Sequence, residues 1–88
     1  MTTGTVNGDT LAGEPDEVVD CRGQRCPLPV IELARRLAQL PMGAVLRVLA
    51  DDPAASSDIP AWCRLRAQEY IGEVDVDGAP AFDVRRLT

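Results

Sequence analysis

Neither histidine nor lysine occurs in this chain of 88 residues, which also has only one tryptophan, one tyrosine and one phenylalanine. The missing histidine argues against a hydrolase or protease in which an imidazole of the same chain activates a cysteine. The few aromatic residues leave the core to Val, Leu, Ile and Ala. Nine basic residues, all arginine, face 14 acidic ones, and the formal charge is −5. Because these arginines form no long basic stripe, we expect no direct, tight binding of nucleic acid.

Long apolar runs are absent too. No segment approaches the ~18 apolar residues of a membrane span, so we expect no membrane contact. The N-terminus also lacks the basic and apolar regions of a signal peptide. The three cysteines are an odd number for a disulfide framework, and we expect reduced thiols in the cytoplasm. Their spacing matches no zinc site, and we expect neither a metal nor a cofactor.

Residues 1–15 are small, polar and without apolar periodicity, so we expect a disordered tail. Residues 16–88 suffice for one small domain. Strand-like and helix-like patterns alternate in it: strands at 17–22 and 44–50, a helix at 27–40, a second helix capped by Asp58, and a closing hairpin that turns at Asp77–Gly78.

This order, β-α-β-α-β-β, predicts an α/β two-layer sandwich, in which a mixed four-stranded sheet carries both helices on one face. Arg35 and Arg36 are expected on the outer face of the first helix, and Arg47 at an exposed position of the second strand. The apolar positions of the first helix that are expected to face the core are Val30, Ile31, Ala34, Leu37 and Ala38.

The segment Cys26-Pro27-Leu28-Pro29 opens the first helix. With Cys26 at the N-cap, its sulfur would lie beside unpaired N–H groups and the partial positive charge of the helix start. Neither proline has an N–H, so only Leu28 could donate to the sulfur.

Two arginines flank this segment, and Arg22-Gly23 and Arg25 are expected to support the thiolate of Cys26 by adding positive charge. The thiolate is the nucleophilic form of cysteine. A thiol of low pKa also leaves faster when an acceptor attacks the outer sulfur of a persulfide. The site could therefore accept and release sulfur without a general base. The competing interpretation is a cysteine that caps the helix without any chemical role, since proline is common in a first turn.

The sequence resembles the TusA family of small sulfur-carrier proteins, also called SirA-like proteins. The family signature is Cys-Pro-x-Pro at a helix start, which Cys26 to Pro29 match. The likeness extends to Asp20, Gly23 and Gly43 and to LADDPAASSDIPAWC at 49–63, and it spans residues 17–86. The resemblance implies a two-layer α/β sandwich, in agreement with the order of elements above.

The resemblance also implies a sulfurtransferase whose catalytic Cys26 carries sulfur as a persulfide. Its donor would be a cysteine desulfurase or a rhodanese, and its acceptor a DsrE-type relay protein or another protein. The sulfur would serve tRNA thiolation at a wobble uridine or, in other branches, sulfur oxidation, molybdenum-cofactor supply or selenium metabolism. We expect a monomer, and the sequence leaves open which partners and which branch apply.

Two positions depart from the family pattern. Many members carry a Gly-His or Glu-His pair late in the second helix, where this chain has Gln68 and no histidine. Any role of that histidine is therefore missing here. Many members also have Glu or Lys between the two motif prolines, where Leu28 stands in this chain. An apolar residue beside the sulfur changes the surface that a partner meets.

The other two cysteines, Cys21 and Cys63, are expected to face the core as structural thiols. A resolving role for Cys63, or an oxidative disulfide between Cys21 and Cys26, is the alternative.

Three carboxylates, Asp51, Asp52 and Asp58, suit turn and capping roles. Because the loop after the second strand should lie near the helix starts, they are also candidates for a docking surface around Cys26. Arg35 and Arg36 have two interpretations, a solvated helix face or a contact with an acidic patch on a partner.

Three functions of different classes remain from the sequence. The leading one is a sulfurtransferase that passes persulfide sulfur between proteins. The alternatives are a non-catalytic regulatory or protein-binding domain of the SirA-like type, and a redox-sensing thiol.

Overall fold

The computed structural model describes residues 14–88, so the predicted disordered tail lies, except for its last two residues, outside the described residues. The predicted order of elements, β-α-β-α-β-β, is confirmed. The elements are β2 (Glu17–Asp20), α1 (Leu28–Leu37), β3 (Val45–Leu49), α2 (Ala55–Arg66), β4 (Glu69–Val76) and β5 (Ala79–Arg85).

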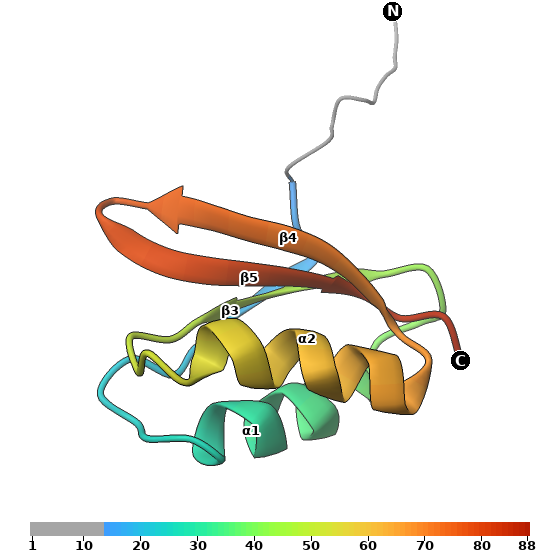
Figure 1. Cartoon of the computed structure of the whole chain (residues 1–88). Helices are drawn as coiled ribbons and strands as arrows, with labels where there is room; N and C mark the ends of the chain where they lie inside the picture. The colour runs from blue at the N-terminus through green and yellow to red at the C-terminus, as the bar shows by residue number, and fades with distance from the viewer. Residues whose placement is uncertain (1–13) are drawn as a thin grey trace, which may run out of the picture.

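The sheet has four strands in the order β2-β3-β5-β4. β2 runs parallel to β3, with Val19 opposite Val48, while β5 is antiparallel to both of its neighbours. A parallel pair needs a crossover connection, and α1 supplies it. Both helices pack on the same face of the sheet (Figure 1). The predicted two-layer sandwich with a mixed sheet is therefore confirmed.

The core lies between the sheet and the two helices and is mainly aliphatic, as the composition predicts. Phe82 is its one large aromatic side chain among the described residues that are fully buried. The helices and the sheet contribute the following buried side chains: Val19, Leu33, Leu37, Leu46, Val48, Ile59, Phe82 and Val84.

The face of α1 that packs on the sheet is rotated by part of a helical turn from the face that the sequence predicted. Pro29, Leu33 and Leu37, spaced four residues apart, are the buried positions of this helix. Ile31 points outward and is 56% exposed. The apolar residues of α1 form two overlapping stripes, and the stripe that includes Pro29 and Leu33 packs on the sheet.

The prediction for Arg47 is also wrong, because this residue is not exposed. Its guanidinium donates two hydrogen bonds to Asp83, Nε to Oδ1 over 2.8 Å and Nη2 to Oδ2 over 2.9 Å. The side chains are 15% and 5% exposed, respectively. Arg47 and Asp83 stand opposite each other on β3 and β5, so this ion pair ties the two central strands together.

The sequence predicted that Asp58 caps α2, and this prediction is wrong. The helix begins three residues earlier, at Ala55, and Asp58 lies in its first turn. The reason is Asp52, whose Oδ1 accepts the N–H of Ala54 over 2.9 Å and whose carbonyl accepts the N–H of Ala55 over 2.9 Å. The predicted Asp77–Gly78 hairpin turn is confirmed, with positive φ at both residues, as a two-residue hairpin turn of type I′ requires.

Candidate functional site

Two loops lie side by side at the end of the sheet where both helices begin, the loop from β2 to α1 and the loop from β3 to α2 (Figure 1). The Cys26 N–H donates to Oδ2 of Asp52 over 2.9 Å. The Gly23 N–H donates to Oδ1 of Asp51, also over 2.9 Å. Asp51 and Asp52 therefore lie beside the Cys26 loop, as the sequence predicted.

Cys26 stands one residue outside the position that the sequence predicts for it. Pro27 is the N-cap residue of α1, and the Cys26–Pro27 peptide bond is cis. The Leu28 N–H donates to the carbonyl of Arg25 over 2.9 Å and therefore not to the Cys26 sulfur. Cys26 is therefore not the N-cap.

The charges around Cys26 are negative, and the prediction of a favoured thiolate is wrong for the free protein. Burial raises the pKa of the Cys26 thiol, and the carboxylates of Asp58 and Asp52 raise it further, to about 11. With a pKa of about 11, Cys26 is mainly a neutral thiol at physiological pH.

The arginines expected to support the thiolate act elsewhere. Arg22 forms an ion pair with Asp20, whose Oδ2 lies 2.6 Å from Nη2 of the guanidinium. The side-chain hydrogen bonds from Arg22 hold the pKa of Asp20 at about 2. The charge of Arg25 helps to lower the pKa of Asp52, after the hydrogen bonds that Asp52 accepts from Ala54 and Cys26. Both arginines thus offset carboxylates instead of contacting the sulfur.

Cys26 is the only one of the three cysteines whose side chain is accessible. It is half-buried, whereas Cys21 and Cys63 are 0% and 1% exposed within the core. The predicted burial of the latter two is confirmed. Beside Cys26, the apolar side chains of Leu28 and Ile31 are 52% and 56% exposed. Being three residues apart, these two share one face of α1 and extend the accessible surface next to the thiol.

Arg35 and Arg36 are not brought to this surface. They lie in the last turn of α1, about 10 Å along the helix axis from Leu28. Arg35 pairs with Glu32 on the same helix. Arg36 pairs with Glu17 on β2 and with Glu32. Their contacts are those of a helix face tied to the neighbouring strand.

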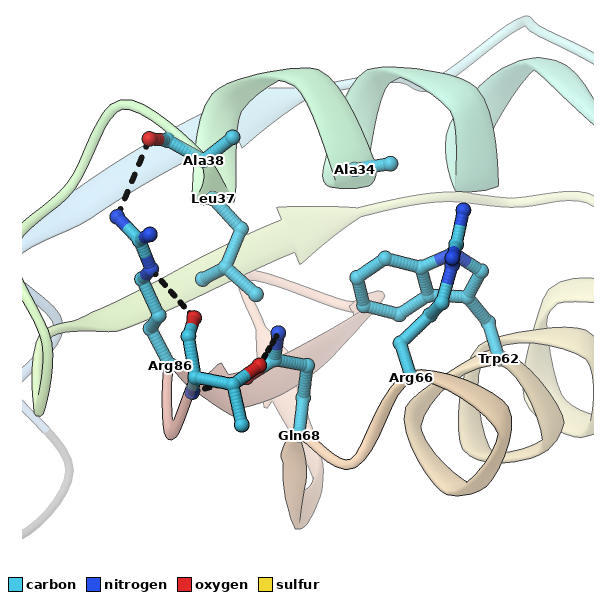
Figure 2. A pocket seen from close by; sticks show the side chains of 8 residues that line it. Ala34, Leu37, Ala38, Trp62, Arg66, Gln68 and Arg86 are labelled. Carbon is cyan, nitrogen blue, oxygen red and sulfur yellow. Dashed lines mark hydrogen bonds between the residues drawn. The ribbon is translucent and has the colours of Figure 1, made fainter.

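Of the surface hollows in the described residues, two lie at opposite ends of the helices. One, of about 420 Å³, lies between the two loops near Cys26 and is lined by Gly23, Gln24, Arg25, Asp51, Asp52 and Pro53. The other, of about 270 Å³, lies at the C-terminal ends of α1 and α2 (Figure 2). There the Arg86 guanidinium donates one hydrogen bond to the carbonyl of Ala38, which follows α1, and one to the carbonyl of Thr88.

Within residues 14–88, no three His, Cys, Asp or Glu side chains gather as metal ligands do. None of the helices in this described range is both long enough and apolar enough to span a membrane.

The effect of Asp58 on the pKa of the Cys26 thiol is a feature that the sequence did not indicate. Asp58 was expected to cap a helix and to line a docking surface. Its carboxylate helps to raise the pKa of Cys26, which lies 32 positions earlier in the chain. Because Cys26 and Asp58 belong to separate segments of the chain, no local sequence pattern could have revealed this effect.

The comparisons with known proteins agree with this architecture. A family model described as sulfurtransferase TusA matches residues 17–86. A crystal structure of the SirA-like protein from Desulfitobacterium hafniense superposes with a TM-score of 0.70. The superposition covers 82% of this chain and 99% of that chain, at 24% sequence identity, and shows that the two share a fold.

Proposed function

Because this chain belongs to the TusA family of sulfurtransferases, we propose that it is a sulfur carrier that accepts a persulfide sulfur on Cys26 and relays it to an acceptor protein. The observation that supports this most is the position of Cys26. It is the one accessible thiol of the three, and it lies at the start of α1 among exposed apolar side chains.

The chemistry needs no group outside the two reacting proteins. The Cys26 sulfur attacks the outer sulfur of the donor's persulfide, a bond forms between these two sulfurs, and the bond between the donor's two sulfurs breaks. The donor thiolate leaves with the bond's electron pair and accepts the proton released from Cys26. The sulfur moves at the same oxidation level, so neither oxidant nor reductant is consumed.

A neutral resting thiol does not prevent this reaction. A cysteine of high pKa is less often ionised, but its thiolate is intrinsically more nucleophilic. Because the resting form is the thiol, Cys26 is also shielded from unspecific oxidation, which follows thiolate character. We infer that Cys26 reacts mainly in complexes that position a persulfide next to it.

The surface around Cys26 is the docking surface we propose for donor and acceptor. It combines Leu28 and Ile31 on α1 with Asp51, Asp52 and Asp58 from the neighbouring loop and α2. A cysteine desulfurase or a rhodanese would supply the sulfur, in the cytoplasm, and a DsrE-type relay protein or another acceptor would take it. Transfer into tRNA thiolation would then run through such a partner, since the chain carries a net charge of −5.

A transfer assay separates this function from the two alternatives. The protein is incubated with a cysteine desulfurase and ³⁵S-labelled cysteine, and the label bound to it is measured before and after reduction. A sulfur carrier gains label that a reductant removes. A non-catalytic binding domain gains none. A redox sensor gains none either, but it forms a sulfenic acid or a disulfide at Cys26 under peroxide.

A further inference from the structure

The hollow of about 270 Å³ lies at the C-terminal ends of α1 and α2, whereas Cys26 precedes the start of α1. In Figure 2 the side chains of Trp62 and Arg66 lie on one side of this hollow and that of Arg86 on the other, with Leu37 between them. None of these residues takes part in the sulfur chemistry proposed above. The hollow is therefore a separate feature of the surface.

The charge that lines this hollow is opposite to that of the whole chain. The chain carries a net charge of −5, yet the charged side chains that line the hollow are Arg66 and Arg86. No Asp or Glu of the described residues lines it with them. Charges of one sign in a concave site attract a counter-ion, so the hollow favours an anion.

The two arginines differ in how far they are engaged. The Arg86 guanidinium donates from Nε to the carbonyl of Thr88 over 2.8 Å and from Nη1 to that of Ala38 over 3.1 Å. The bond to Ala38 offsets the negative end of α1 and holds Arg86 in the wall of the hollow. Arg66 is exposed in the last turn of α2 and makes no hydrogen bond or ion pair with any of the residues 14–88. Its N–H donors are thus available to a ligand.

Beside Arg66 the hollow has an apolar surface. Trp62 is half-buried, packs against the hydrophobic core and stands one turn before Arg66 on α2. Residues four apart are neighbours on a helix face, so the indole and the guanidinium lie next to each other. Ala34 and Leu37 of α1 add aliphatic surface. A flat apolar ligand can therefore pack on Trp62 while its negative group meets Arg66.

The volume limits the size of the ligand. Sites for small molecules typically measure about 300–1,000 Å³, and this hollow lies just below that range. A single ring with one short acidic group matches it.

We propose that this hollow is a second binding site, which takes a small aromatic carboxylate with its ring on Trp62 and its carboxylate on Arg66. The inference goes beyond the sulfur-carrier function and does not depend on it.

Trp62 is the only tryptophan of the chain, so its fluorescence reports directly on the hollow. Benzoate is titrated into the full chain at pH 7.5, with excitation selective for tryptophan. The emission should change saturably, with a dissociation constant on the order of 1 mM for so small a ligand. Benzamide, which has the ring without the charge, and acetate, which has the charge without the ring, should each bind about tenfold more weakly or less tightly still.

Arg66→Gln should weaken benzoate binding about tenfold, because the charge-assisted hydrogen bonds are lost. The matched control is Arg64→Gln, since Arg64 is also exposed on α2 but does not line the hollow, and it should keep the wild-type affinity. Both replaced side chains are exposed, so both variants should fold. Equal affinity in Arg66→Gln and wild type, or equal weakening in the two variants, overturns the inference.

Nuclear magnetic resonance gives the location of the ligand independently. Benzoate should shift the indole N–H of Trp62 and the side-chain amide of Gln68, which also lines the hollow, and leave the amides of Gly23 and Cys26 unchanged. Shifts centred on the Cys26 loop overturn the inference. So does an emission change that fails to saturate, or one that benzamide produces as readily as benzoate.

Discussion

Cys26 should react with iodoacetamide more slowly than an ordinary cysteine at neutral pH, although it is the accessible thiol of the three. Its surroundings raise its pKa from the ordinary value of 9.0 to about 11. Because each pKa unit changes the ionised fraction tenfold, the thiolate population at pH 7.5 falls about hundredfold. The more basic thiolate is about tenfold more nucleophilic, which recovers part of the loss. The net rate should therefore be about tenfold lower than that of an unperturbed cysteine.

The assay follows alkylation of each cysteine by peptide mass spectrometry between pH 7 and pH 11, with a short unstructured cysteine peptide as the reference. Cys26 should be modified before Cys21 and Cys63, which are buried. Its rate should rise about tenfold per pH unit through pH 10 and still be rising near pH 11, where it is about half-maximal. A half-maximal rate below pH 8.5, or a rate at pH 7.5 above that of the peptide, would refute the reasoning from Asp58 and Asp52.

Three further predictions concern stability and binding. Asp83→Ala should lower the free energy of unfolding in urea by about 2–4 kcal/mol, because it leaves the mostly buried Arg47 without its carboxylate, and a loss below about 1 kcal/mol would contradict this. Burial raises the pKa of Cys63 from 9.0 to about 11. The stability that this protonated thiol contributes is therefore complete below pH 9 and is lost as the pH rises toward 11. Cys63→Ala should show a smaller loss of unfolding free energy over this pH range, and an equal loss in both proteins would contradict the prediction. Filter binding at physiological salt should show no submicromolar affinity for tRNA, given the net charge of −5.

The order of elements was predictable because each signal for it is local. The alternating apolar residues of the strands and the Asp77–Gly78 pair each lie inside or beside the segment that they define. The face of α1 was less predictable, since its apolar residues fit two stripes. Packing on the sheet selected the stripe with Leu33 and left Ile31 exposed.

The position of Cys26 was predictable from the sequence, whereas the acidity of its thiol was not. That Cys26 would open α1 beside the loop of Asp51 and Asp52 followed from the motif and the topology. The electrostatics of its thiol did not, because they depend on burial and on the carboxylates of Asp52 and Asp58, which lie 26 and 32 positions further along the chain. A helix-start argument considers only neighbours in sequence, and in this protein burial of the thiol and two carboxylates from a different segment outweigh it.

The most direct test of the account is the mass of the protein after incubation with a cysteine desulfurase and cysteine. Wild type and Cys63→Ser should each gain about 32 Da, one sulfur atom, on the Cys26 peptide, and a reductant should remove it. Cys26→Ser, which nearly preserves the size of the side chain, should gain nothing. If Cys26→Ser instead gains this mass on another cysteine at a rate comparable to wild type, Cys26 is not the carrier site and the central claim fails.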